Sequence, residues 1–323
     1  MSAVQCGLCP KNCYIADGET GDCRIRINLN GTLHAVTYGH PCAVHLDPVE
    51  KKPLFHFYPG SSAFSVATAG CNLHCRNCQN WEISQQFPAD IPAYNLPPDK
   101  IISQALKYKC RSIAYTYSEP CIFYEYTLDC SVKARDKGIK NILVTAAYLN
   151  KKPMKELFRY TDAANIDLKA FSDSFYRKVC GGTLKPVLQN LELALECSVE
   201  LEVTNLLIPG LNDKENMIND LCRWHAEYLG KDIPLHFSRF APRYKMKNLP
   251  PTPAATLGKA AKIAKSYGLR YVYVGNLASA TAENTYCPVC GKLLVERRVY
   301  TIKNNVLKNG KCPYCGEKIY GCF

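Results

Sequence analysis

Apolar runs alternate with amphipathic stretches along the middle of the chain, between residues 62 and 275. The runs are short, rich in β-branched and aromatic residues, and apolar on both faces, which is typical of parallel strands buried on two sides. We predict strands at 62–68, 111–117, 140–146, 163–169, 199–207, 233–240 and 270–274. The stretches between them repeat apolar residues with helical spacing. We predict helices at 98–109, 121–137, 153–159, 184–196, 213–229 and 254–267. This alternation indicates an α/β fold on one parallel sheet, either a barrel or an open doubly wound sheet.

The two ends of the chain have a different pattern, in which closely spaced cysteines take the place of long apolar runs. The first part contains four cysteines and then Asn30-Gly31, a dipeptide that favours a type I′ hairpin between short strands. The last part contains two Cys-x2-Cys pairs around an apolar, hairpin-like insert at 293–302. We therefore divide the chain into a Cys-rich N-terminal module with a hairpin, an α/β domain and a ribbon-like or rubredoxin-like module, at 1–60, 61–276 and 277–323.

The charge and the cysteine content indicate in which cellular compartment the protein works and which kinds of partner it binds. The net charge of +12 at pH 7 favours an acidic partner, although a solvated basic surface explains it equally well. The chain has 19 cysteines but no secretory signal pattern and no apolar run of membrane-spanning length. We therefore expect a cytoplasmic protein with reduced thiols and no membrane partner. In a protein from a reducing compartment, closely spaced cysteines indicate metal-binding sites. The eight cysteines that are scattered along the chain are expected in the hydrophobic core.

Three cysteines directly after the first predicted strand carry the strongest chemical signal, with the spacing Cys71-x3-Cys75-x2-Cys78. Thiols at this spacing can surround one [4Fe–4S] cluster. Because the cluster has four irons and the motif has three thiols, one iron remains open for a substrate or cofactor. A ferredoxin that only transfers electrons would supply a fourth cysteine nearby, whereas the next one here is Cys110. The spacing therefore indicates a catalytic iron–sulfur site.

The loop from Cys71 to Trp81 resembles the radical S-adenosylmethionine (SAM) enzymes, and within them the pyruvate formate-lyase activating enzyme group. The resemblance is closest to the radical SAM protein of the AmmeMemoRadiSam system. Three further stretches support it: Cys6-Gly-Leu-Cys-Pro-Lys-Asn-Cys13, Lys52-Pro-Leu-Phe-His-Phe-Tyr-Pro-Gly60 and Tyr115-Thr-Tyr-Ser-Glu-Pro120. The resemblance implies a partial (β/α)6 parallel barrel with its site at the carboxyl ends of the strands. The chain departs from the family at Asn77, where an aromatic residue is usual.

The resemblance also implies which residues bind SAM, all of them in or just after predicted strands: Ser118, Glu119, Asp167, Lys169, Asn205 and His236. Glu119 would offer a carboxylate to the cationic amino group of SAM. Asp167 and Lys169 face the same side of their strand, where two opposite charges need either each other or a ligand. For Glu119 the alternative is a structural carboxylate at a helix N-terminus. For His236 it is a structural histidine in an apolar strand.

The cysteines at the two ends predict further metal sites. The C-terminal set has the spacing of a zinc ribbon and is expected to bind structural zinc; it comprises Cys287, Cys290, Cys312 and Cys315. The N-terminal set would bind either zinc or an auxiliary iron–sulfur cluster, and its spacing does not separate the two. It comprises Cys6, Cys9, Cys13 and Cys23.

Together these features predict a radical SAM enzyme of the oxidoreductase class, with a [4Fe–4S] cluster and SAM as cofactors. The resemblance implies that SAM is cleaved reductively to a 5′-deoxyadenosyl radical, which abstracts hydrogen from a protein residue or a small molecule. It also implies an electron donor of the flavodoxin or ferredoxin type. Because the AmmeMemoRadiSam system has several components, it further implies partner proteins. The alternative is a non-catalytic zinc or iron–sulfur module that binds nucleic acid or protein. That alternative explains the charge and the end cysteines, but not the Cys71 motif, Glu119 or Asp167.

Overall fold

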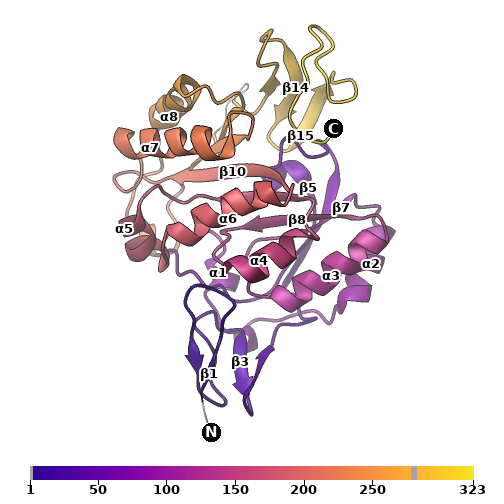
Figure 1. The fold of residues 1–323 in the computed structure, drawn as a ribbon, viewed down its shortest axis with the longest axis vertical. Helices are drawn as coiled ribbons and strands as arrows, with labels where there is room; N and C mark the ends of the chain where they lie inside the picture. The colour runs from indigo at the N-terminus through magenta and orange to yellow at the C-terminus, as the bar shows by residue number, and fades with distance from the viewer. Residues whose placement is uncertain (1–2, 278–281) are drawn as a thin grey trace.

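A computed structural model of the chain describes residues 3–277 and 282–323. Its centre is a sheet with the strand order β12-β11-β10-β9-β8-β7-β6-β5 (Figure 1). Neighbouring strands from β6 to β12 are parallel, and β5 pairs antiparallel with β6 at one edge. The strands are β5 (Ala43–Pro48), β6 (Ser62–Ala67), β7 (Ser112–Tyr115), β8 (Lys140–Thr145), β9 (Ala163–Asp167), β10 (Glu200–Leu207), β11 (Leu235–Arg239) and β12 (Val272–Gly275).

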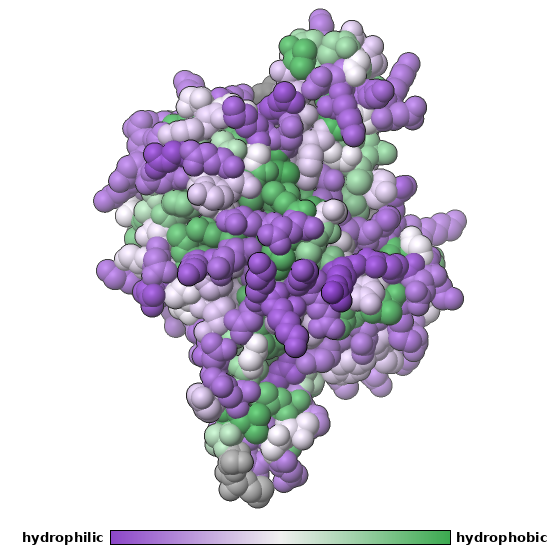
Figure 2. All heavy atoms as spheres, in the orientation of Figure 1, coloured by the Kyte–Doolittle hydropathy of each residue, from purple (hydrophilic) through white to green (hydrophobic). Residues whose placement is uncertain are grey.

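Helices connect the parallel strands and cover the outer face of the sheet (Figure 1). They are α1 (Trp81–Ser84), α2 (Pro98–Lys107), α3 (Tyr124–Asp136), α4 (Lys151–Phe158), α5 (Asp173–Phe175), α6 (Lys185–Glu196), α7 (Glu215–Trp224) and α8 (Ala254–Ser266). Short 3₁₀ or π-helical turns lie at Val49–Lys51, Pro88–Asp90, Tyr176–Cys180, His225–Leu229 and Tyr244–Met246. Figure 2 shows a largely hydrophilic surface on this side. The helices turn their apolar sides inward, where buried residues form one large core with the sheet.

The predicted α/β fold with a central, mainly parallel sheet is confirmed, and each predicted strand and helix of the α/β domain is present. The apolar runs were informative because the parallel strands are buried on both faces; every residue of β7, for example, is buried. Strand β5 was not predicted. Its edge position leaves His45 and Leu46 exposed, so its sequence has no continuous apolar run.

The two Cys-rich modules lie at opposite ends of the molecule (Figure 1). The N-terminal one has the strand pairs β1 (Val4–Gln5) with β2 (Tyr14–Ile15) and β3 (Arg26–Leu29) with β4 (Thr32–Ala35). Asn30 and Gly31 have φ values of 53° and 83°, so the predicted type I′ hairpin is confirmed. The C-terminal module is a sheet of β13 (Thr285–Tyr286), β14 (Leu293–Arg298) and β15 (Thr301–Asn305). Its core also contains Phe55, Tyr271 and Tyr273, of which Tyr273 belongs to β12. Among the described helices, none has the length and apolarity needed to span a membrane.

A buried ion pair stabilises the edge of the sheet at β5. The carboxylate of Asp47 accepts hydrogen bonds from Lys52 (2.6 Å), Lys51 (2.9 Å) and the Tyr117 hydroxyl. Only 1% of the Lys52 side chain is exposed, and its ammonium lies 4.4 Å from the centre of the Tyr117 ring. Burial alone would raise the pKa of Asp47, but Lys52, Tyr117 and Lys51 hold it well below its ordinary value. The group therefore stabilises the fold in its charged form.

We expect Asp47→Asn to lower the free energy of unfolding at pH 7 by about 3–5 kcal/mol, because Lys52 is left buried without a counter-charge. The pKa of Asp47 is lower in the folded protein than in the unfolded chain, where it is about 3.9. Its contribution to stability is therefore complete at pH values above about 3.9 and is lost as the pH falls below that value. Urea unfolding at pH 7 and at pH 3 measures both effects. The matched control is Asp99→Asn, which removes the exposed pair with Lys133 and should change neither value. Equal midpoints for wild type and Asp47→Asn at pH 7 would contradict this role.

Candidate functional site

A cavity of 400 Å³ lies at the carboxyl ends of the parallel strands. Residues that end each strand, or follow it directly, build its wall, because these ends meet at one edge of the sheet. Strand register places Asp167 of β9, Thr204 of β10 and His236 of β11 side by side in that wall. The C-terminal module adds Glu283 and Tyr300 to the lining. The cavity thus collects polar side chains from most of the chain.

The three cysteines of the predicted cluster motif line one side of this cavity, in the loop after β6: Cys71, Cys75 and Cys78. The loop is fixed from several directions. The amide of His74 donates to the carbonyl of Cys180 (2.7 Å), and the amide of Leu73 donates to the Cys71 sulfur (3.3 Å). The Cys78 sulfur lies 3.1 Å from the Ser84 hydroxyl of α1. The thiols are therefore held in place by the protein alone.

The number and placement of these thiols fit an iron–sulfur cluster. Cys71, Cys75 and Cys78 all line the same cavity, and Cys71 is close enough to the other two to be affected by their charge. Three thiolates can bind three irons of a [4Fe–4S] cluster and leave one iron without a protein ligand. The residues present therefore fit a cluster bound at three irons.

Glu119 is a buried acidic group in the cavity wall, with 2% of its surface exposed. Its carboxylate accepts hydrogen bonds from the amides of Cys121 (3.1 Å) and Ala146 (2.8 Å) and from the Thr145 hydroxyl. The Cys121 thiol also lies within hydrogen-bonding reach of this carboxylate. Burial raises the pKa of Glu119 above its ordinary value, while the donors oppose this shift. A cationic ligand would therefore stabilise the ionised form of Glu119 in this site.

Asp167 and Lys169 form an ion pair at the end of β9, with Lys169 Nζ 3.0 Å from Asp167 Oδ2. Both side chains line the cavity. Burial would lower the pKa of Lys169, but the carboxylate of Asp167 helps to raise it well above the ordinary value. Lys169 is therefore a fixed cation. The charges that the sequence placed on one face of this strand do pair with each other, and both stay accessible to a ligand.

The remaining predicted SAM contacts divide into two groups. Ser118 and His236 line the cavity. Ser118 donates its hydroxyl to the carbonyl of Thr68 (2.7 Å), and His236 Nε2 lies 2.6 Å from the buried carboxylate of Glu202. Asn205 is not part of the described lining. Its amide donates to the carbonyl of Leu168 (2.7 Å), and the alternation along β10 turns Thr204 toward the cavity instead.

Two features near the site were not predicted as functional from the sequence. Cys180 is buried in the core, as expected for a scattered cysteine, but it also lies against the sulfur of Cys75. No motif indicated this contact, because Cys180 is about 100 residues from Cys75 in the chain. Thr145, next to Glu119, lies in the stretch Val144-Thr-Ala-Ala-Tyr148, and its position at the end of a predicted strand was the signal available.

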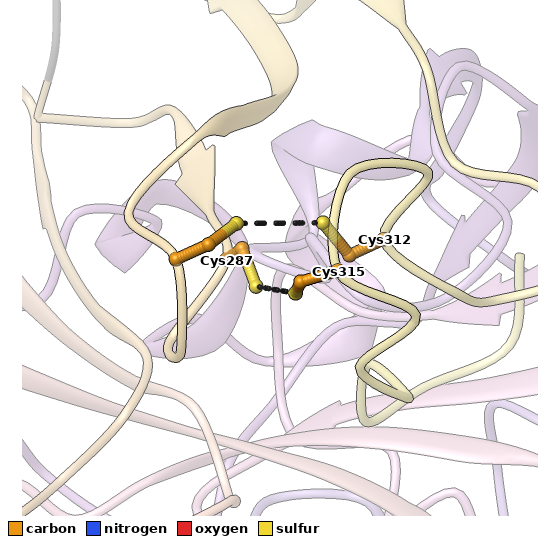
Figure 3. A group of neighbouring side chains, drawn as sticks. Cys287, Cys312 and Cys315 are labelled. Atoms are coloured by element: carbon orange, nitrogen blue, oxygen red, sulfur yellow. Dashed lines mark hydrogen bonds between the residues drawn. The ribbon is translucent and has the colours of Figure 1, made fainter.

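The C-terminal cysteines form a second, separate site (Figure 3). The sulfur atoms of Cys287 and Cys315 are 3.5 Å apart, and those of Cys290 and Cys312 are 3.7 Å apart. All four lie within 4.8 Å of one another. A tetrahedral ion with metal–sulfur bonds of ~2.3 Å would space its thiolates by about 3.8 Å. The set therefore fits one metal ion closed by four thiolates.

Comparison with known proteins agrees with this site. Residues 65–222 match the model of the Radical SAM superfamily. The chain is 46% identical to the uncharacterized protein MJ0808 of Methanocaldococcus jannaschii, over 98% of this chain and 95% of that protein. It is 24% identical to the benzylsuccinate synthase activating enzyme of Thauera aromatica, over 60% of this chain and 65% of that enzyme. The fold resembles a radical SAM methyltransferase from Sphaerobacter thermophilus with a TM-score of 0.51, at 14% identity over 73% of this chain and 71% of that one.

The chain therefore belongs to the same family as the protein MJ0808. Its residues 65–222, which include the Cys71 motif, form a Radical SAM domain. Activating enzymes are more distant relatives, since the chain spans about two thirds of the benzylsuccinate synthase activating enzyme. The matches do not single out the AmmeMemoRadiSam protein named in the sequence analysis.

Proposed function

We propose that the protein uses the strand-end cavity to bind SAM against a [4Fe–4S] cluster held by Cys71, Cys75 and Cys78. The observation that carries the proposal is that three thiols, a buried carboxylate and a lysine paired with Asp167 line one 400 Å³ cavity. The cavity volume is in the range of small-molecule sites. When bound, the cluster and SAM supply a one-electron reductive cleavage that yields a 5′-deoxyadenosyl radical able to abstract hydrogen.

The protein groups have separate roles in this proposal. Glu119 offers its buried carboxylate to the cationic amino group of SAM, which would form a charge-assisted hydrogen bond with it. Lys169 offers its ammonium to the carboxylate of SAM, while Asp167 holds that ammonium in place. His236, fixed by Glu202, and Ser118 complete the polar wall. The apolar strands around the cavity exclude water from the reacting groups.

The substrate would enter from the open mouth of the cavity, beside Tyr300 and Glu283 of the C-terminal module. Relatives named as activating enzymes for benzylsuccinate synthase and pyruvate formate-lyase support a protein residue as the hydrogen donor. A small molecule remains the other class of substrate. We place the reaction among the oxidoreductases, with a flavodoxin-type or ferredoxin-type protein as the electron donor.

Electron paramagnetic resonance of the anaerobically reconstituted, dithionite-reduced protein tests the proposal. A [4Fe–4S]⁺ signal that changes when SAM is added is the expected result, because SAM would bind the open iron. A signal that ignores SAM would contradict the proposal. If the same protein instead bound DNA or RNA with a steep salt dependence, the nucleic-acid-binding module would be the better account.

We further propose zinc at the C-terminal set and expect Cys290→Ser to remove about one zinc ion per chain. The thermal midpoint should fall as well, because the ion joins two loops that pack on Tyr271 and Tyr273. Metal analysis and thermal unfolding of the purified variant measure the two effects. The matched control is Cys322→Ser, a half-buried cysteine of the same module outside the set. Unchanged zinc in Cys290→Ser would refute the assignment.

A further inference from the structure

The strand-end cavity extends beyond the cysteine loop to the opposite end of strand β6. Its lining includes Glu50, in the turn Val49–Lys51 that follows β5. Strand β5 runs antiparallel to β6, so its last residue, Pro48, pairs with the first residue of β6, Ser62. The amide of Gly60 donates to Glu50 Oε1 (2.8 Å), which holds this carboxylate near the amino end of β6. At ~3.3 Å per residue, the length of β6 separates this end of the cavity from the cysteine loop by about 17 Å.

Glu50 is a buried carboxylate with an unused acceptor atom. Its exposed fraction is 1%, and its Oε2 atom has no hydrogen-bond partner within residues 3–277 and 282–323. Burial raises the pKa of Glu50 above its ordinary value, while the Gly60 amide opposes this shift. A buried acceptor without a donor is costly. A ligand that brings a donor to this atom would therefore stabilise the site, and a cationic donor would do so most strongly.

The C-terminal module completes this end of the cavity with Glu283 and Tyr300. Glu283 is half-buried, and its burial raises the pKa of its carboxyl group. Tyr300 offers an exposed aromatic ring, which is a favourable neighbour for a cation. The groups proposed to bind SAM lie at the carboxyl ends of the strands. Two carboxylates and an aromatic ring therefore border space that remains for a second molecule.

The cations near these two carboxylates have other partners. Lys51 lines the cavity, but its ammonium pairs with Asp47 (2.9 Å). Arg297 is close enough to Glu50 and Glu283 to be affected by their charge. Its guanidinium donates instead to uncharged oxygens, those of the Thr285 hydroxyl (2.7 Å), the Phe55 carbonyl (2.7 Å) and the Glu283 carbonyl (3.0 Å). Among the described residues, the ion pairs of this region leave out the carboxylates of Glu50 and Glu283.

We propose that Glu50 and Glu283 bind a cationic nitrogen group of the substrate, an ammonium or a guanidinium, at the end of the cavity opposite the cysteine loop. This assignment rests on the proposed radical SAM function, because it gives the chemical class of the molecule that would lose hydrogen. Binding of the charged group there would hold the rest of the substrate between this end and SAM. A free small molecule and a lysine or arginine side chain of a protein both offer such a group.

Calorimetric titration of the anaerobically reconstituted protein in excess SAM tests the assignment with a cation and a neutral molecule of similar shape, propylguanidinium and propylurea. We expect wild type to bind propylguanidinium about 10-fold more tightly than propylurea, because only the cation forms charge-assisted hydrogen bonds with both carboxylates. Glu50→Gln and Glu283→Gln should each bind propylguanidinium about 10-fold more weakly. The matched control is Glu296→Gln, which changes an exposed carboxylate of β14 outside the described lining and should bind both probes as wild type does.

A tripeptide, acetyl-Gly-Arg-Gly-amide, distinguishes the two sources of the cation. Tighter binding of the tripeptide than of propylguanidinium would assign the site to a side chain of a protein substrate. Tighter binding of propylguanidinium would assign it to a free small molecule.

Equal affinities of wild type for propylguanidinium and propylurea would overturn the assignment, and so would a Glu50→Gln protein that binds the cation as wild type does. If Glu50→Gln does not fold, the wild-type comparison and Glu283→Gln decide. The resonance of the reduced cluster separates this assignment from the proposed function. A resonance that responds to SAM, in a protein that binds both probes equally, refutes the cation site alone. Preference for the cation, in a protein whose resonance ignores SAM, refutes the proposed function and leaves the cation site standing.

Discussion

Cys75→Ala is expected to lose the catalytic cluster and to lower the formation of 5′-deoxyadenosine from SAM by on the order of 1,000-fold or more. The reason is that the protein supplies three thiolates in the cavity, and two do not hold a cluster with a defined open iron. Iron analysis and product quantification on the same reconstituted sample measure the two losses together. Iron at this site should fall by about four per chain.

Cys180→Ala is the matched control, because this thiol is also buried and lies against the sulfur of Cys75. We expect it to keep both its iron and its activity within a few-fold of wild type. If Cys180→Ala loses the cluster as Cys75→Ala does, a fourth thiolate closes the cluster. The open iron, and with it the mechanism, would then be wrong.

Glu119→Gln is expected to weaken SAM binding by about 10- to 100-fold, which corresponds to one charge-assisted hydrogen bond. Glutamine keeps the size of the side chain but removes its charge. Its NH2 group would also face the amides of Cys121 or Ala146, which are donors themselves. Equilibrium binding of SAM to the reconstituted, oxidised protein gives the dissociation constant directly.

Glu82→Gln serves as the control for Glu119, because Glu82 is an exposed carboxylate on α1, close to the cysteine loop in the chain. It should bind SAM as wild type does. The iron content of Glu119→Gln should remain that of wild type, which separates a lost SAM contact from a damaged cluster. Unchanged SAM affinity in Glu119→Gln would leave this carboxylate with a structural role only.

The sequence predicted secondary structure best in strands whose side chains are buried on both faces of the sheet. The parallel strands have no exposed face, so their apolar runs predicted the whole central sheet apart from β5. Strand β5 pairs with one neighbouring strand and has an exposed face, so its sequence lacks the continuous apolar run that marked the other strands. At the two ends of the chain the cysteines stood out in the sequence, because a site for a metal requires thiols at short, fixed spacings.

The sequence predicted the location of the site better than the individual residues that line it. In β10 the resemblance indicated Asn205, but Thr204 and Leu206 line the cavity. A shift of one residue along a strand moves a side chain to the opposite face, and sequence alone fixes such a register poorly. Cys180 lies in the core as expected, but its contact with Cys75 could not be predicted from the sequence. Its approach to Cys75 depends on the packing of the turn at Tyr176–Cys180 against the cysteine loop.

The most direct test of the central claim is the product of SAM cleavage. Anaerobically purified protein with a reconstituted cluster is reduced with dithionite, SAM is added, and 5′-deoxyadenosine is quantified over time. The account predicts 5′-deoxyadenosine that accumulates with wild type and is absent with Cys75→Ala. No 5′-deoxyadenosine from wild-type protein with a full, reducible cluster would contradict it.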